Sequence, residues 1–484
     1  MDERTEEPST SVPAGDTRRT QQVEEIRARW AWVKPSVWTV PMLTALEQGV
    51  KGGKWFRLND KVFAERNLLA AFQRVARKKG AAGVDHETVD AFERRLPEVL
   101  RKLSTDLNAG TYTPQSIRRV HILKPGTNET RPLGIPTVRD RVVQAAVLNV
   151  IEPIFERGFA EHSYGFRPGR GCKDALRRVD ELIRKGHVHV VDADLKGYFD
   201  SIPHDRLMNR VEEKIADGPT LRLIELFLKA DILEDAKQWT PEGGTPQGAV
   251  LSPLLSNIYL NELDHLMVQH GIEMVRYADD FVILCQTAED AALALELVRQ
   301  WVVANGLTLH PEKTRVVDVR TESFDFLGYS FRGQDHWPRK KSIQKLRAAI
   351  RQKTPRTTGR SMQCTIVDVN RTLKGWFGYF QHSSYKTVFN AQDAWVRQRL
   401  RSMLRHFLKT SWTSTRTGHA AVAKCVLCQA GAVQSVNRPC HGRSILTEVR
   451  PSTGEPCAVD LHARFGGRGA RTQSGLPTPI KETR

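Results

Sequence analysis

Two acidic clusters, each beside an apolar segment, hold the residues of this chain best suited to chemistry. Asp279 and Asp280 lie in a short turn between two apolar runs of high β-propensity, a pattern that predicts a hairpin. Asp194 ends another apolar run, and Asp192 and Asp200 are its neighbours in sequence. Carboxylates at two strand ends can hold two magnesium ions about 3.5–4 Å apart, the arrangement used for in-line phosphoryl transfer.

Either acidic cluster alone would be an ordinary turn, because aspartate accepts turn geometry and hydrogen-bonds its own backbone. A third segment lies between the two clusters and strengthens the interpretation. Residues 244–253 (GTPQGAVLSP) open an apolar run with helical spacing. The clusters must therefore be positioned by strands on either side of a buried helix.

Ten short motifs follow one another in a specific order. From about residue 54 to about residue 409, the chain resembles the reverse transcriptase–maturases encoded within bacterial group II introns. Any one motif is weak evidence, whereas the ordered set is specific. The motifs are KGAAGVD (79–85), ILKPG (122–126), RPLGIP (131–136), HSYGFRPG (162–169), DLKGYFD (194–200), TPQG (245–248), YADD (277–280), HPEKT (310–314), FDFLG (324–328) and LKGWFGYF (373–380).

The resemblance implies an α+β right-hand polymerase fold, with fingers, a palm built on an antiparallel sheet, and a helical thumb. With 484 residues the chain is long enough for two to four domains. We expect a partly disordered N-terminal extension, with the disorder over 1–20, and a linker at 332–339 leading into the thumb. The expected domains are an N-terminal extension (1–60), fingers and palm (61–335), thumb or maturase domain (336–410), and a basic C-terminal segment of uncertain fold that could bind DNA (411–484).

The resemblance assigns Asp194, Asp279 and Asp280 as catalytic ligands of two Mg²⁺ ions. The expected reaction is attack of a primer 3′-hydroxyl on the α-phosphate of an incoming nucleotide, with pyrophosphate as leaving group. Asp192 and Asp200 are close enough in sequence to compete with Asp194, which is preferred because it matches the first acid of the family.

Several residues match family positions that contact the incoming nucleotide. Phe199 is the expected steric gate that excludes a ribose 2′-hydroxyl, and Tyr198 is the competing position. An arginine fork and a lysine point charge suit the triphosphate. The predicted nucleotide-binding residues are Lys124, Arg131, Phe199, Gln247 and Lys313.

Positive charge is concentrated in the expected thumb. The net charge is +18, and residues 339–409 carry 17 lysines and arginines against two acids, a balance of 17 − 2 = +15. Closely spaced like charges destabilise a solvated helix, so phosphate neutralisation is the natural use of this segment. The predicted RNA-binding residues in this segment are Lys374, Arg397, Arg399, Arg401 and Arg405. By the resemblance, Arg167 and Arg170 are further RNA-binding residues, expected to contact template phosphates from a loop of the fingers.

These features together predict the partners. They are group II intron RNA, an RNA template with a DNA primer, deoxynucleoside triphosphates and target DNA. No run of about 20 apolar residues indicates a membrane span. A bacterial, cytoplasmic, nucleoid-associated protein is expected.

Cysteines near the C-terminus raise the question of zinc. Cys425 and Cys428 form a CxxC pair, followed by Cys440 and His441, which suits a tetrahedral site. No second CxxC or paired-histidine motif completes the endonuclease pattern of some family members. Zinc is therefore the less favoured interpretation, and we expect no active nuclease.

Other functional classes remain open at this stage. One is a splicing protein whose polymerase is vestigial, and another is a retron-type or defence-associated reverse transcriptase. The three acids, Gln247 and an aromatic gate are all present, which favours a working polymerase that also assists splicing and intron mobility (retrohoming). The motif at 373–380 argues against the retron type.

Overall fold

A long buried helix organises the N-terminal part of the protein, whose computed structural model describes residues 14–123, 130–355 and 360–410. Nearly every residue of α7 (Val138–Glu156) is buried, including the polar residues Asp140, Gln144 and Asn149. The Thr137 hydroxyl caps it by accepting a hydrogen bond from the Asp140 amide at 3.1 Å. The other helices of this part are α1 (Ala14–Arg29), α2 (Val40–Gln48), α3 (Asn59–Phe63), α4 (Glu65–Ala76), α5 (Val89–Arg94), α6 (Leu96–Ala109), α10 (His204–Glu212) and α11 (Gly218–Leu228).

The expected disorder over residues 1–20 is wrong for its last part. Helix α1 begins at Ala14, and its C-terminal half buries Ile26. Trp30 follows the helix, is also buried, and donates from its indole nitrogen to Glu47 Oε1 at 2.8 Å. Burial of this apolar side stabilises a helix whose polar composition alone predicts disorder.

The predicted fingers contain a four-stranded sheet. Strands β1 (Ile117–Leu123) and β2 (Thr130–Ile135) form an antiparallel hairpin in which Ile122 pairs with Arg131. The short strands β4 (Ile232–Glu234) and β5 (Lys237–Trp239) extend it in the order β2-β1-β4-β5.

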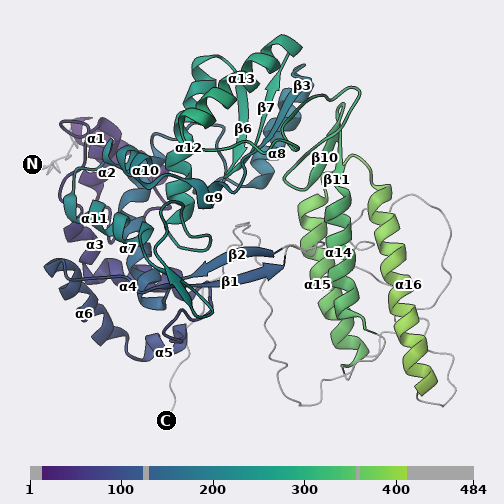
Figure 1. Ribbon diagram of the computed structural model, residues 1–484, viewed down its shortest axis with the longest axis horizontal. Helices are drawn as coiled ribbons and strands as arrows, with labels where there is room; N and C mark the ends of the chain where they lie inside the picture. The colour runs from purple at the N-terminus through teal and green to yellow at the C-terminus, as the bar shows by residue number, and fades with distance from the viewer. Residues whose placement is uncertain (1–13, 124–129, 356–359, 411–484) are drawn as a thin grey trace, which may run out of the picture. The chain divides into compact units, whose positions relative to one another are not determined.

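The predicted palm is an antiparallel sheet covered on both faces. Its order is β6-β7-β3-β8, from the strands β3 (His189–Asp194), β6 (Glu273–Tyr277), β7 (Asp280–Cys285) and β8 (Arg315–Asp318). Helices α12 (Ser252–Gln269) and α13 (Ala288–Ala304) pack on one face, and α8 (Cys172–Arg184) packs on the other (Figure 1). Because successive strand residues alternate between faces, Val191 and Val190 of β3 belong to different cores.

Residues 332–339 are not the linker that the sequence predicted. Residues 332–338 belong to a small antiparallel sheet in the order β11-β10-β9, made of β9 (Phe324–Phe326), β10 (Tyr329–Arg332) and β11 (Asp335–Pro338), and Arg339 is the residue before the next helix. Gly333, with φ +56°, forms the turn of the outer hairpin. The glycine and the polar residues that indicated a linker lie in the turn and in the partly buried edge strand of this hairpin.

Three helices make up the predicted thumb: α14 (Lys340–Lys353), α15 (Met362–Phe380) and α16 (Thr387–Thr410), which lie side by side in Figure 1. Their shared core contains Leu346, Ile350, Leu373 and Leu400, so the helical spacing read from the sequence is confirmed. With the antiparallel palm sheet, these helices confirm the α+β class.

Candidate active site

The structure brings the three predicted catalytic acids together. In the register of β3 and β7, Asp194 lies opposite Asp280. Tyr277 pairs with Asp280 across the β6–β7 hairpin, so Ala278 and Asp279 form its turn. Alternation along each strand places Asp192, Asp194 and Asp280 on the same face of the sheet, the one packed against α8 and β9.

Crowding of these carboxylates changes their acidity. Burial raises the pKa of Asp279, and the charge of Asp194 adds to the shift. Loss of hydration around the carboxylate, followed by repulsion from Asp279, Asp192 and Asp194, raises the pKa of Asp280 to about 7. Asp280 nevertheless keeps exposed surface at the start of β7. The site is therefore a concentration of negative charge.

Three basic side chains approach this acidic face. Lys313 Nζ lies 2.6 Å from Asp194 Oδ2, and Arg315 Nε lies 3.7 Å from Asp192 Oδ2. Arg339, the residue before α14, lowers the pKa of Asp280. Burial and the three neighbouring acids raise this pKa by more, so the net shift is upward. Lys313 was predicted to contact the nucleotide. In this structure it neutralises Asp194, and its contact with a nucleotide stays a prediction.

The carboxylate oxygens of this site suit magnesium, but the side chains are not yet arranged around a common metal position. Within the described residues, no three His, Cys, Asp or Glu side chains are arranged to hold a metal ion. Hard carboxylate oxygens are nevertheless the ligands that Mg²⁺ prefers, and cations would relieve the repulsion among Asp194, Asp279 and Asp280. These three residues are the ones that would hold the ions.

Removing divalent cations should lower the melting temperature of the wild-type protein. An ion bound between carboxylates stabilises only the folded state, by about 2.7 kcal/mol per site at about 100 times its Kd. Differential scanning fluorimetry with magnesium and with EDTA measures the difference. A variant with both Asp279→Asn and Asp280→Asn should lose it. Equal wild-type melting temperatures in both conditions would argue against a cation site.

The two gate candidates after β3 have different environments. Both belong to the short helix α9 (Tyr198–Ser201). Tyr198 is 2% exposed, and its hydroxyl donates to the Ser256 carbonyl at 2.8 Å. Phe199 is half-buried, with its ring centroid 5.5 Å from that of Tyr198. Tyr198 is therefore a core residue, and Phe199 presents the accessible aromatic surface.

Asp200 lies among different residues from those around the acidic cluster. It lines an open cavity of about 640 Å³ together with Arg119, Trp239 and Thr245. Partial burial raises its pKa, Arg119 opposes this, and no other acid contributes. Of the two sequence neighbours that competed with Asp194, only Asp192 faces the same cluster.

The TPQG loop packs against the fingers hairpin. The Gln247 carbonyl accepts a hydrogen bond from the Gly134 amide at 2.7 Å, and the Gln247 side chain is half-buried. At Gly248, with φ +109°, a Cβ would lie 2.6 Å from the Gly134 carbonyl oxygen. Arg131 is exposed on β2, and Lys124 lies outside the described residues. The nucleotide contacts of Gln247, Arg131 and Lys124 stay predictions.

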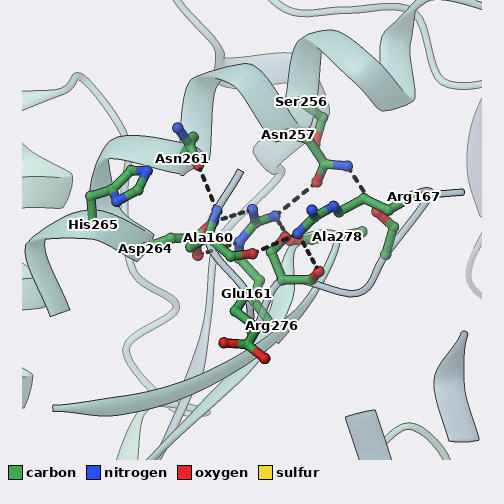
Figure 2. A network of polar contacts seen from close by, with 12 residues as sticks. Ala160, Glu161, Arg167, Ser256, Asn257, Asn261, Asp264, His265, Arg276 and Ala278 are labelled. Atoms are coloured by element: carbon green, nitrogen blue, oxygen red, sulfur yellow. Dashed lines mark hydrogen bonds and ion pairs between the residues drawn. The ribbon is translucent and has the colours of Figure 1, made fainter. Parts of the chain in front are cut away.

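A buried polar network behind the acidic turn was not anticipated (Figure 2). Arg276 is fully buried and bonds to Asp264, Asn257 and the Ala278 carbonyl. The sequence held a signal, since an arginine inside an apolar strand is rarely buried unless paired. Asn257 and Asp264 are also polar positions seven residues apart in an apolar helix, which places them on one face.

Arg167 was predicted to contact phosphate, and the structure shows this to be wrong. Its side chain is 3% exposed and forms an ion pair with Glu156 at 2.8 Å. Its Nη1 donates to the carbonyls of Ala160 and Ser163 at 2.5 and 2.8 Å. Arg170 is half-buried, donates to the Glu161 carbonyl and lies over the Tyr164 ring, so its RNA contact stays a prediction.

Two of the four arginines predicted to bind RNA on α16 have partners within the protein. Arg397 forms an ion pair with Asp393 at 2.7 Å. Arg399 donates to the Thr354 carbonyl at 2.8 Å at the end of α14. Both side chains remain half-buried rather than enclosed, so their RNA contacts stay predictions. The predicted RNA-binding residues that are exposed in this domain are Lys374, Arg401 and Arg405.

Two further expectations concern other parts of the chain. Cys425, Cys428, Cys440 and His441, with the rest of 411–484, lie outside the described residues. None of the helices that the structure describes is long and apolar enough to cross a membrane.

Comparisons with known proteins match most of the described region. Residues 122–331 match the reverse transcriptase (RNA-dependent DNA polymerase) family, and residues 343–419 match the group II intron maturase-specific domain. Protein YkfC of Escherichia coli (strain K12) is 32% identical over 341 residues, covering 62% of this chain and 85% of YkfC. Group II intron-encoded protein LtrA of Lactococcus lactis subsp. cremoris is 42% identical over 201 residues.

The match to LtrA spans 41% of this chain but only 33% of LtrA. Among solved structures, a chain of a Cas6-RT-Cas1–Cas2 complex is 27% identical and aligns with a TM-score of 0.34, over 51% of this chain and 41% of that one.

Proposed function

Because the chain belongs to the family of group II intron-encoded reverse transcriptases with a maturase-specific domain, we propose that it is an RNA-directed DNA polymerase that copies intron RNA into cDNA. The observation that carries the proposal is the register of β3 and β7, which sets Asp194 opposite Asp280 beside the Asp279 turn. This activity implies that the protein acts in the bacterial cytoplasm, in association with the nucleoid.

Each residue of the site has a proposed part in nucleotidyl transfer. Asp194, Asp279 and Asp280 would hold two Mg²⁺ ions, which would supply activation of the primer 3′-hydroxyl and stabilisation of the negative charge on the pyrophosphate. Phe199 limits the space below the sugar of the incoming deoxynucleotide. Gln247 and Arg131 orient that nucleotide, so that the protein contributes position and electrostatic field rather than a covalent intermediate.

The thumb supplies the second part of the proposal, binding of intron RNA to assist splicing and mobility. Its support is the local balance of +15 over residues 339–409 and the exposure of Lys374, Arg401 and Arg405. Template RNA with a DNA primer and target DNA are the further polyanions that such a surface suits.

Replacing Arg401 or Arg405 with glutamine should weaken binding to intron RNA and flatten its salt dependence. Each lost phosphate contact should reduce the slope of log K against log salt by about 0.7–0.9. Filter binding or fluorescence anisotropy over a salt series measures the slope. Arg299→Gln, an exposed arginine on α13, is the matched control. Equal slopes for all variants would mean that the RNA surface lies elsewhere.

Primer extension on an RNA template with deoxynucleotides tests the enzyme directly. It should be run beside a splicing assay of the intron with and without the protein. Extension that requires magnesium is the expected result. Splicing assistance without any extension would instead support a maturase whose polymerase is vestigial.

A further inference from the structure

Arg276 lies directly behind the acidic turn and has no access to solvent. Its Nε donates to Asp264 Oδ1 at 2.7 Å, and its Nη2 pairs with Asp264 Oδ2. Its Nη1 donates both to Asn257 Oδ1 and to the Ala278 carbonyl, each at 2.9 Å. Figure 2 shows the guanidinium between these side chains of α12 and the backbone of the turn.

The other side of the turn is closed by backbone packing. The Tyr164 amide donates to the Arg276 carbonyl at 2.8 Å, and Asn257 Nδ2 donates to the Gly165 carbonyl at 2.8 Å. A Cβ on Gly165 would lie 2.2 Å from the Ala278 amide nitrogen, so only glycine fits there. The turn therefore lies between the Gly165 backbone and the Arg276 guanidinium.

The turn itself has a conformation that needs such support. Ala278 has φ +60°, a left-handed conformation that a residue with a Cβ adopts only when its surroundings impose it. The Ala278 carbonyl is one of the groups that Arg276 holds, and Asp279 is the next residue. A buried ion pair is a poor general source of stability, and fixing one specific geometry is a recognised use of it.

We propose that Arg276 is a positioning residue of the active site, which holds the Ala278 carbonyl and so fixes Asp279 and Asp280 in the arrangement that accepts divalent cations opposite Asp194. This inference rests on the proposed polymerase function. Arg276 does not touch the substrate, and it acts through the backbone of the turn, with Asp264 and Asn257 fixing the guanidinium.

Arg276→Lys is the informative variant. Lysine keeps the charge beside Asp264 but cannot reach Asp264, Asn257 and Ala278 together, because its ammonium is a point charge rather than a fork. We expect the magnesium concentration for half-maximal primer extension to rise, and kcat to fall, by about 10- to 100-fold, as for other residues that orient metal ligands. The KM for deoxynucleotides and the affinity for RNA should change little.

Arg178→Lys is the matched control. Arg178 pairs at 2.9 Å with Glu273, which begins the same strand β6 at the end away from the turn. This variant alters an ion pair of the same strand and should leave the magnesium requirement unchanged. If both lysine variants shift it equally, Arg276 has no special role in positioning.

A second variant separates positioning from folding. Arg276→Met with Asp264→Leu replaces the pair by apolar side chains and leaves no unpaired buried charge. It should keep a cooperative melting transition but lose most of the rise in melting temperature that magnesium gives the wild type.

This melting measurement needs no polymerisation. A wild type without primer extension would therefore overturn the proposed function, while the magnesium-dependent melting shift would still test Arg276. If magnesium raises the melting temperature of both the Arg276→Lys variant and the double variant as much as that of the wild type, Arg276 does not position the turn.

Discussion

Asp279→Asn combined with Asp280→Asn is expected to abolish magnesium-dependent cDNA synthesis while leaving RNA binding intact. Both carboxylates lie at the β6–β7 turn opposite Asp194, and the variant removes two of the three negative charges that would hold the ions. Metal ions contribute several kcal/mol to the transition state, so extension should fall by about a thousandfold or more. Primer extension and RNA anisotropy on the same preparation measure both outcomes.

A matched control for this variant is found in α13, the helix that follows β7. Glu289 and Asp290 are adjacent exposed acids in the first turn of α13. Neutralising them changes the net charge by the same amount and should leave extension at the wild-type rate. Joint loss of RNA binding and extension in the active-site variant would contradict the separation of catalysis in the palm from RNA binding in the thumb.

Phe199→Val is expected to admit ribonucleotides. The half-buried ring presents the accessible aromatic surface after β3, and discrimination there works by a clash with the 2′-hydroxyl rather than by attraction. Removing the ring should reduce the preference for deoxynucleotides by about 10- to 200-fold, the range of discrimination by shape in an apolar pocket. Single-nucleotide incorporation of dNTP and rNTP pairs gives the ratio of kcat/KM.

Tyr198→Phe is the control for the gate. It removes only the hydroxyl that donates to Ser256, so sugar selectivity should stay as in the wild type. Relaxed selectivity in this variant, with unchanged selectivity in Phe199→Val, would move the gate to Tyr198.

Local patterns predicted those features that depend on near neighbours in sequence. The hairpin around Asp279 follows from two β-prone runs and a turn, and the thumb core follows from helical spacing at Leu346 and Ile350. The hairpin at 332–339 was missed because its turn and exposed edge have the composition of a linker. Composition does not reveal that Phe331 is buried.

Long-range partners account for the other errors. Arg167 is a surface residue by composition, and only the folded chain shows that Glu156 and two backbone carbonyls surround it. The hydrogen bond from Arg399 to Thr354 also joins residues 45 apart in sequence, so helical spacing did not predict it. The Arg276 network could not be predicted from the sequence for the same reason, although an arginine in an apolar strand indicated that a partner must exist.

The base of helix α15 is tied to the small sheet by two tyrosines. The Tyr329 hydroxyl donates to the Tyr379 carbonyl, and the Tyr379 hydroxyl donates to the Leu327 carbonyl, each at 2.8 Å. These two hydrogen bonds fix the last turn of α15 to the small sheet. Since β9 of that sheet packs against β3 and β7, the packing continues from α15 to the strands that carry Asp194 and Asp280. Displacement of this end of α15 would therefore be expected to move the strands that carry these two acids.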